Sequence, residues 1–217
     1  MGFDVIIIAG GKGTRMEEKL PKPLVNAKGK PILFHQIEYL YDGADKIILS
    51  LGHMANEIIK AVKKEFKDKK IIFSVEDKPL GTSGGLKKAF SLSSSDTIIA
   101  LNCDDVTDID VAKLAKLDGN YVCVSHPRLP FGLVTRDENG YARFVEKPIL
   151  GGWVSCGWYK FERRFIENFP DNGMLEYDVF PKAKLKRYLH NGFWMSLNSK
   201  KDIAEFEKLK SWPSMKL

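Results

Sequence analysis

The chain has 217 residues, a length that suits a single domain able to bury roughly 70% of its unfolded surface. No stretch approaches the roughly 20 consecutive apolar residues of a membrane-spanning helix, and the N-terminus lacks the features of a signal peptide, which predicts a cytoplasmic protein without membrane partners. The formal net charge is +6, but lysines alternate with acids along the expected helices and the three cysteines lack metal-type spacing, which argues against nucleic-acid binding and a zinc site.

The first expected element is a buried parallel strand at residues 5–8, which leads into the glycine loop GGKGTR at residues 10–15. Glycines let backbone N–H groups approach a ligand closely, and Lys12, Arg15 and Lys22 add positive charge, a combination typical of a polyphosphate site. The alternative is that these glycines only turn the chain. Neither the dinucleotide fingerprint nor the ATPase phosphate loop fits, because the former lacks its third glycine and the latter its final G-K-[ST].

Helices and strands then alternate along the first half of the chain. Helices are expected at residues 31–41, 56–66 and 86–92, and strands at residues 46–51, 70–75 and 97–102. The alternation predicts an α/β, Rossmann-like fold with a mixed, mainly parallel sheet and helices on both faces. Loops at the carboxyl ends of such strands line a ligand crevice, so residues 76–85 are expected beside the glycine loop, where Thr82 or Ser83 can also cap a helix. The lone histidines His35 and His53 are expected to be structural.

Acidic side chains follow the strand that ends at residue 102. Carboxylates in this position, beside a phosphate loop, are suited to hold Mg²⁺ against a triphosphate, which makes Asp104 the first candidate metal ligand. We expect Asp105 to be solvated and Asp108 to cap a helix at residues 109–117.

The second half of the chain has a different pattern, with short strands expected at residues 121–125, 132–136, 141–147 and 154–161. The pair Asn139-Gly140 is a strong hairpin signal, so a small antiparallel insertion is expected in or beside the parallel core. The remaining expected elements are helices at residues 163–169 and 179–189, a strand at residues 192–197 and a helix at residues 199–209.

Five segments resemble, in the same order, motifs of the sugar-1-phosphate nucleotidylyltransferase family. They are G-G-x-G-T-R at residues 10–15, Lys-Pro at residues 22–23, the nucleobase loop at residues 80–85, the metal-bearing Asp104, and Glu-Lys-Pro at residues 146–148. The resemblance covers most of the chain and implies one domain, 1–217, with a nucleotide-binding half at residues 1–118 and an acceptor-binding half, containing the antiparallel sugar-binding insertion, at residues 119–217. It further implies that a nucleotidyl group passes from a nucleoside triphosphate (NTP) to a sugar 1-phosphate, with Mg²⁺ as cofactor and pyrophosphate as the second product.

The resemblance also implies roles for individual residues. Arg15 and Lys22 would be catalytic, with Lys22 bridging the α-phosphate and the incoming phosphate. Nucleotide-binding residues would be Ala9, Gly10, Gly11, Gly13, Thr14, Glu76, Gly81 and Thr82. Acceptor-binding residues would be Gly132, Glu146, Lys147 and Gly157, with Glu146 accepting hydrogen bonds from sugar hydroxyls and Lys147 holding the sugar phosphate. In-line attack of one phosphate on another requires positioning and charge neutralisation rather than a protein nucleophile.

Two positions depart from the family pattern. Glu76 stands five residues before Gly81, where relatives that read thymine or uracil carry a glutamine. Since a carboxylate only accepts hydrogen bonds, Glu76 suits cytosine or guanine, and together with the segment Gly192-Phe193-Trp194 it favours CTP, with GTP next. Residues 191–202 resemble the glucose-1-phosphate cytidylyltransferase branch, in which an aspartate at the position of Asn198 is the second metal ligand. An amide oxygen brings no negative charge, so weaker Mg²⁺ binding or lost activity is expected.

Several alternatives stay open. In one alternative the acceptor is a non-sugar phosphate, such as phosphocholine or a polyol phosphate. In the other, which Asn198 motivates, the chain is a catalytically silent nucleotide-sugar-binding regulatory protein. Association into a homo-oligomer is also left open. The aromatic residues Trp153, Trp158, Tyr159 and Tyr177 are expected to belong to the core.

Overall fold

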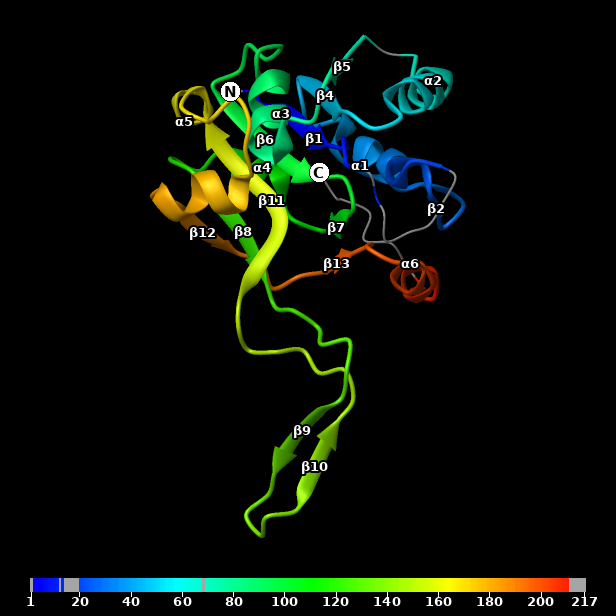
Figure 1. The fold of residues 1–217 in the computed structure, drawn as a ribbon, viewed down its shortest axis with the longest axis vertical. Helices are drawn as coiled ribbons and strands as arrows, with labels where there is room; N and C mark the ends of the chain where they lie inside the picture. Colours follow the sequence, from blue (N-terminus) through cyan, green and yellow to red (C-terminus); the bar gives the residue numbers. More distant parts are fainter. Residues whose placement is uncertain (1, 12, 14–19, 68, 211–217) are drawn as a thin grey trace.

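The computed structural model describes residues 2–11, 13, 20–67 and 69–210. Its centre is a seven-stranded sheet with the order β12-β8-β11-β6-β1-β4-β5 (Figure 1). The strands are β1 (Asp4–Ile8), β4 (Lys46–Leu51), β5 (Ile71–Val75), β6 (Thr97–Asn102), β8 (Tyr121–Ser125), β11 (Val154–Glu162) and β12 (Lys186–Leu189). Every neighbouring pair is parallel except the two made by β11, which is antiparallel to β6 and to β8. The expected mixed, mainly parallel sheet is confirmed.

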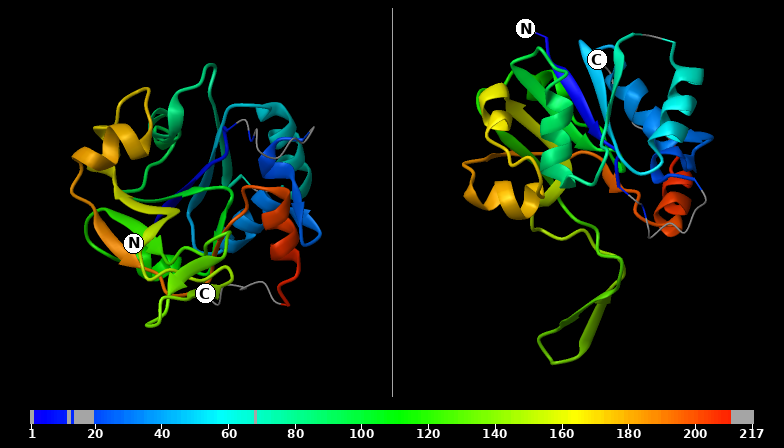
Figure 2. Two further views of the ribbon diagram at one scale, coloured as in Figure 1. Left: turned by 60° about the horizontal axis from the view of Figure 1, so that its bottom comes forward. Right: turned by 45° about the horizontal axis from the view of Figure 1, so that its top comes forward.

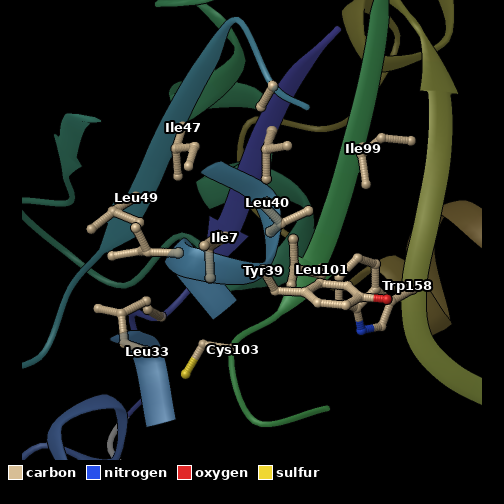
Figure 3. Close-up of a cluster of buried hydrophobic side chains, with 14 of the residues drawn as sticks. Ile7, Leu33, Tyr39, Leu40, Ile47, Leu49, Ile99, Leu101, Cys103 and Trp158 are labelled. Atoms are coloured by element: carbon tan, nitrogen blue, oxygen red, sulfur yellow. The ribbon is translucent and has the colours of Figure 1, made fainter. Parts of the chain in front are cut away.

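Two apolar clusters cover the two faces of this sheet. Side chains alternate along a strand, so Ile7 of β1 packs in one cluster and its neighbour Ile6 in the other. The first cluster joins the sheet to α1 (Ile32–Tyr41), α2 (Ala55–Glu65) and α4 (Val111–Ala115), and Figure 3 shows Leu33 and Leu40 of α1 beside Ile7. The second includes side chains of α3 (Gly81–Phe90) and α5 (Arg163–Glu167). Helices therefore lie on both faces, as the alternating sequence pattern predicted.

Smaller elements surround the sheet. A short hairpin of β2 (Asn26–Ala27) and β3 (Lys30–Pro31) packs against α6 (Lys200–Glu207), and β7 (Asp105–Thr107) pairs with β13 (Trp194–Ser196). The predicted antiparallel hairpin is present as β9 (Leu133–Arg136) and β10 (Ala142–Val145), and it projects away from the sheet in Figure 1 and in the right-hand view of Figure 2. Short helical turns occur at η2 (Lys22–Leu24), η3 (Leu175–Val179) and η4 (Phe180–Lys182). Among the described residues, none of the helices combines the length and apolar character that crossing a bilayer requires.

Three local expectations are wrong. The helix expected at residues 179–189 ends within η4, and its second half is β12, because Pro181 interrupts the helix and β8 offers a free edge for parallel pairing. Helix α3 begins at Gly81 rather than residue 86. The cap of α4 is Asp110, which accepts the N–H of Lys113 at 2.8 Å, whereas Asp108 accepts the N–H of Phe193 at 2.7 Å. Asp108 thus stabilises the segment before β13, through its hydrogen bond with Phe193, instead of capping a helix.

Candidate functional site

A cavity of about 640 Å³ opens where β1 and β6 end. Ile8 and Asn102 are register partners in these parallel strands, so the segments that follow them emerge at the same edge of the sheet. The cavity is lined by Ile8, Ala9, Gly11, Gly13, Lys22, Pro23, Thr82, Asn102, Cys103, Asp104, Met174, Glu176, Tyr177 and Asn198. Seven of the candidate site residues are among them, which places both glycine loops and both candidate metal ligands around one space.

Lys22 lies between the two candidate metal ligands. Its ammonium group donates hydrogen bonds to the carboxylate of Asp104 and, at 2.9 Å, to Oδ1 of Asn198. The Lys22 and Asp104 side chains are 13% and 21% exposed, so their attraction is only partly screened by water. A second hydrogen bond fixes the orientation of the Asn198 amide: its Nδ2 donates to Oγ of Ser196 at 2.7 Å, which leaves the amide oxygen facing Lys22.

Asp105 forms the buried support of this group. Its carboxylate accepts hydrogen bonds from Asn102 Nδ2 at 3.1 Å and from Trp194 Nε1 at 3.2 Å, and only 6% of the residue is exposed. Burial, followed by the charge of neighbouring Asp104, raises the pKa of Asp105 to about 7. The expectation that Asp105 is solvated is therefore wrong, since it ties β6 to β13 beneath the cavity.

The oxygen atoms in this cavity suit a divalent cation. Asp104 and Asn198 both direct an oxygen at one positive charge, which here is the ammonium of Lys22. Mg²⁺ in proteins commonly takes one or two side-chain oxygens and completes its shell with phosphate oxygens and water. Within the part of the chain that the structure describes, no three His, Cys, Asp or Glu side chains gather around one point. A magnesium proposal consequently rests on Asp104 and Asn198 together with substrate oxygens.

The first glycine loop approaches Lys22 closely. Gly13 has φ +59°, and a Cβ placed on it would lie 2.8 Å from Cβ of Lys22, so only glycine allows both residues to line the cavity. Gly10 packs against Gly52 and its carbonyl accepts the N–H of His53 at 3.1 Å, which anchors the start of the loop. The candidate residues Thr14 and Arg15 lie outside the described residues, so their roles remain predictions.

The second glycine loop forms the opposite wall with η3. Gly81 has φ +72°, and a Cβ there would lie 2.2 Å from the carbonyl oxygen of Gly173. Thr82 Oγ1 accepts the N–H of Leu175 at 2.9 Å, which fixes η3 beside the start of α3. Glu76 does not line the cavity; its carboxylate accepts the N–H of Leu80 at 3.0 Å and shapes the loop. Its base-reading role remains a prediction.

Met174 and two residues of η3, which follows it, were not assigned to the site from sequence. Met174, Glu176 and Tyr177 line the cavity, and Tyr177 is 77% exposed, so the expectation that it is a core residue is wrong. The same expectation is confirmed for Trp158 and Tyr159, which are buried. The available sequence signal for this wall was an aromatic residue between two acids, four residues after Gly173.

The acceptor-binding candidates lie in two places. Gly157 has φ +74° within a bulge of β11, and a Cβ there would lie 2.0 Å from Oδ2 of Asp105, so it borders the support of the cavity. Gly132, Glu146 and Lys147 lie at the base of the β9–β10 hairpin and do not line the cavity. Lys147 Nζ instead contacts Glu205 of α6 at 2.9 Å. The structure thus gathers the described candidates for nucleotide and metal, apart from Gly10, Glu76 and Gly81, and leaves these three acceptor candidates outside.

Comparison with known proteins identifies the family. The family model described as nucleotidyl transferase matches residues 4–195. The chain belongs to the nucleotidyl transferase family. The chain is 33% identical to the mannose-1-phosphate guanylyltransferase catalytic subunit beta of Drosophila melanogaster, over 93% of the chain and 61% of that protein. It is 34% identical to a mannose-1-phosphate guanyltransferase of Emericella nidulans, over 91% of the chain and 61% of that protein. The chain therefore spans about three fifths of the length of these curated relatives.

Two solved structures share the fold of this chain. The chain superimposes on HddC from Yersinia pseudotuberculosis complexed with GMP-PN with a TM-score of 0.78 and 30% identity, covering 94% of this chain and 98% of HddC. A putative glucose-1-phosphate thymidylyltransferase from Bacillus anthracis, in complex with a sucrose, gives a TM-score of 0.72 at 17% identity, covering 97% of each chain, and shows the fold alone.

Proposed function

We propose that this nucleotidyltransferase transfers a guanylyl group from GTP to a sugar 1-phosphate, giving a nucleotide sugar and pyrophosphate. The observation that carries the proposal is the position of Lys22, between Asp104 and Asn198 and facing the cavity that the two glycine loops enclose. An ammonium group that contacts two side-chain oxygen atoms, beside the backbone of a glycine loop, suits a site for a polyphosphate and a metal.

The choice of base follows the relatives rather than the sequence-based preference for CTP. Two relatives are named for guanylyl transfer to mannose 1-phosphate, and the HddC structure was solved with GMP-PN. The carboxylate of Glu76, on which the preference for CTP depended in part, accepts a hydrogen bond from its own loop, and Glu76 does not line the cavity. We therefore place GTP first and take mannose 1-phosphate as the first acceptor to test.

The proposed reaction joins two anions. An oxygen of the sugar phosphate attacks the α-phosphorus of GTP, the bond from the α-phosphorus to the bridging oxygen breaks, and pyrophosphate leaves with that electron pair. Gly11 and Gly13 offer backbone N–H groups to the triphosphate, while Lys22 neutralises the phosphates at the reacting centre. Mg²⁺, held by Asp104 and Asn198, would supply further charge neutralisation when bound. We further propose that Arg15 and Thr14 bind the triphosphate, that Glu146 accepts hydrogen bonds from the sugar hydroxyls and that Lys147 binds the sugar phosphate.

The test is a matrix of four NTPs against mannose 1-phosphate, glucose 1-phosphate, phosphocholine and a polyol phosphate, with Mg²⁺ and pyrophosphate release as the readout. We expect GTP with a sugar 1-phosphate to exceed every other pairing at least about tenfold in kcat/KM, which corresponds to roughly 1.4 kcal/mol of discrimination. Faster release with CTP would restore the sequence-based preference. Release only with phosphocholine or the polyol phosphate would refute a sugar acceptor.

One observation favours a second candidate function, a catalytically silent protein that binds nucleotide sugars. Asn198 replaces the expected second carboxylate, and its oxygen already accepts a hydrogen bond from Lys22. Calorimetric titration with GDP-mannose separates the two functions. Binding of this product without pyrophosphate release from any pairing supports the silent protein, whereas turnover excludes it.

A further inference from the structure

A second cavity, of about 630 Å³, lies at the end of the sheet opposite the candidate functional site. Strand β11 is antiparallel to β6, so Glu162 at the end of β11 is the register partner of Thr97 at the start of β6. Gly2, just before β1, also lines this cavity, and Figure 1 shows the start of β1 and helix α5 at the same end of the sheet. The functional cavity lies at the other end of β6, roughly 17 Å away at about 3.3 Å per residue, so the two cavities are separate.

Lys160 is the buried cation of this second cavity. It is 2% exposed, and its neighbours at residues 158–161 of β11 are buried aromatic side chains. The Lys160 ammonium donates a hydrogen bond to the carbonyl oxygen of Gly119 at 2.8 Å, whereas Oε1 of Glu162 lies 3.6 Å away, beyond hydrogen-bond range. An ammonium carries three N–H donors, so these contacts use only one of them at hydrogen-bond distance. Burial of a charge with so little compensation is costly and lowers the pKa of Lys160.

The other charged residues of the cavity leave mainly cationic groups without partners. Four basic and three acidic residues line it. Lys116, at the end of α4, and Arg164, in α5, are exposed, and within the described chain neither side chain makes a hydrogen bond or an ion pair. Two of the three acids are engaged, since Glu162 accepts a backbone N–H at 2.6 Å and Asp96 Oδ1 lies 3.5 Å from Nε of Arg163. The cavity therefore suits an anionic ligand.

We propose that this second cavity binds a small molecule that carries a phosphate group. Phosphate oxygens are strong hydrogen-bond acceptors that lysine and arginine side chains commonly bind in proteins. The phosphate would contact the ammonium of Lys160, and Lys116 and Arg164 would neutralise its charge. Ala115 and Leu117 offer an apolar surface to the organic part of the ligand. The volume of about 630 Å³ lies within the roughly 300–1,000 Å³ of small-molecule sites.

The test follows the backbone amide chemical shifts of residues 115–119 and 160–164 while the full chain is titrated with inorganic phosphate, glucose 1-phosphate or GMP. We expect saturable shifts with each probe, and a dissociation constant at least about tenfold lower for one of the two organic phosphates than for inorganic phosphate. Lys116→Ala and Arg164→Ala should each raise the dissociation constants about three- to tenfold. Lys113→Ala is the matched control, because Lys113 is an exposed lysine of α4 that does not line the cavity.

Lys160→Met removes the buried ammonium and should abolish saturable binding, with circular dichroism as the check that this variant folds. Where it does not fold, the two exposed variants decide. The absence of saturable shifts at these amides, or equal weakening by Lys113→Ala and Lys116→Ala, would overturn the proposal. Binding of inorganic phosphate without tighter binding of either organic phosphate would indicate an adventitious ion only and would overturn it as well. Shifts around Lys22 report the functional cavity separately, so the outcome is independent of the proposed function.

Discussion

Lys22 donates a hydrogen bond from its ammonium group to Oδ1 of Asn198 at 2.9 Å, across 176 residues of sequence. The same ammonium contacts the carboxylate of Asp104, so one positive charge joins the segments that follow β1, β6 and β13. The Lys22 ammonium thus contacts the two oxygen atoms, from Asp104 and Asn198, that are the candidate ligands of a metal ion. A bound triphosphate, by attracting the ammonium, would release those oxygens to a metal.

Lys22→Ala should lower kcat about 10²- to 10³-fold, the usual effect of removing one group that stabilises developing charge. The side chain faces the cavity rather than the core, so the thermal melting temperature should change little. Pyrophosphate release measures the first effect and differential scanning calorimetry the second. The control is Lys60→Ala, which removes an exposed lysine of α2. Equal turnover of the two variants would show that Lys22 is not part of the chemistry.

Asn198→Asp should lower the Mg²⁺ concentration for half-maximal activity, by roughly tenfold, because a second carboxylate then faces the cation beside Asp104. The control is Ser196→Ala, which removes the acceptor of the Asn198 Nδ2 hydrogen bond and leaves the charge unchanged. A metal titration of activity compares the two. If the Asn198→Asp titration coincides with that of the wild type, Asn198 does not face the metal.

The sequence predicted the parts of the fold that depend on local patterns. The apolar runs of β1, β4, β5 and β6 read as buried parallel strands because they are covered on both faces. Strand β12 was missed because its residues are mostly exposed, and pairing with β8 rather than local preference makes it a strand.

The candidate site likewise contains residues that the sequence predicted and residues that it did not. Lys22, Asp104 and Asn198 belong to sequence motifs, and their meeting was predicted. Glu176 and Tyr177 reach the cavity through the contact of Thr82 with Leu175, 93 residues apart, which no local pattern indicates. The buried role of Asp105 depends likewise on β13, a strand far along the chain.

His35 should make stability depend on pH. It is 6% exposed, its Nε2 lies 2.7 Å from the carbonyl oxygen of Ala27, and burial lowers the pKa of His35 below its ordinary 6.5. Below pH 6.5 the unfolded chain binds a proton that the folded chain does not, so the free energy of unfolding falls as the pH drops toward the lowered pKa.

Urea unfolding of the wild type and His35→Gln, at a series of pH values, measures this contribution. The wild type should be the more stable above pH 6.5, and its advantage should shrink by up to about 1.4 kcal/mol per pH unit below that value. A difference that stays constant with pH would mean that His35 titrates alike in both states.

Gly157→Ala should destabilise the fold by about 2–4 kcal/mol, since the backbone at φ +74° disfavours a side chain and the new Cβ would lie 2.0 Å from Oδ2 of buried Asp105. Gly151→Ala is the matched control, because a Cβ at Gly151 meets no atom within 4 Å, and its effect should stay within about 0.5 kcal/mol. Urea unfolding compares the two. Because Asp105 supports the segment that carries Asp104, the Gly157 variant should also lose turnover under conditions where it remains folded. Equal stability of the two variants would show that the bulge of β11 yields without disturbing Asp105.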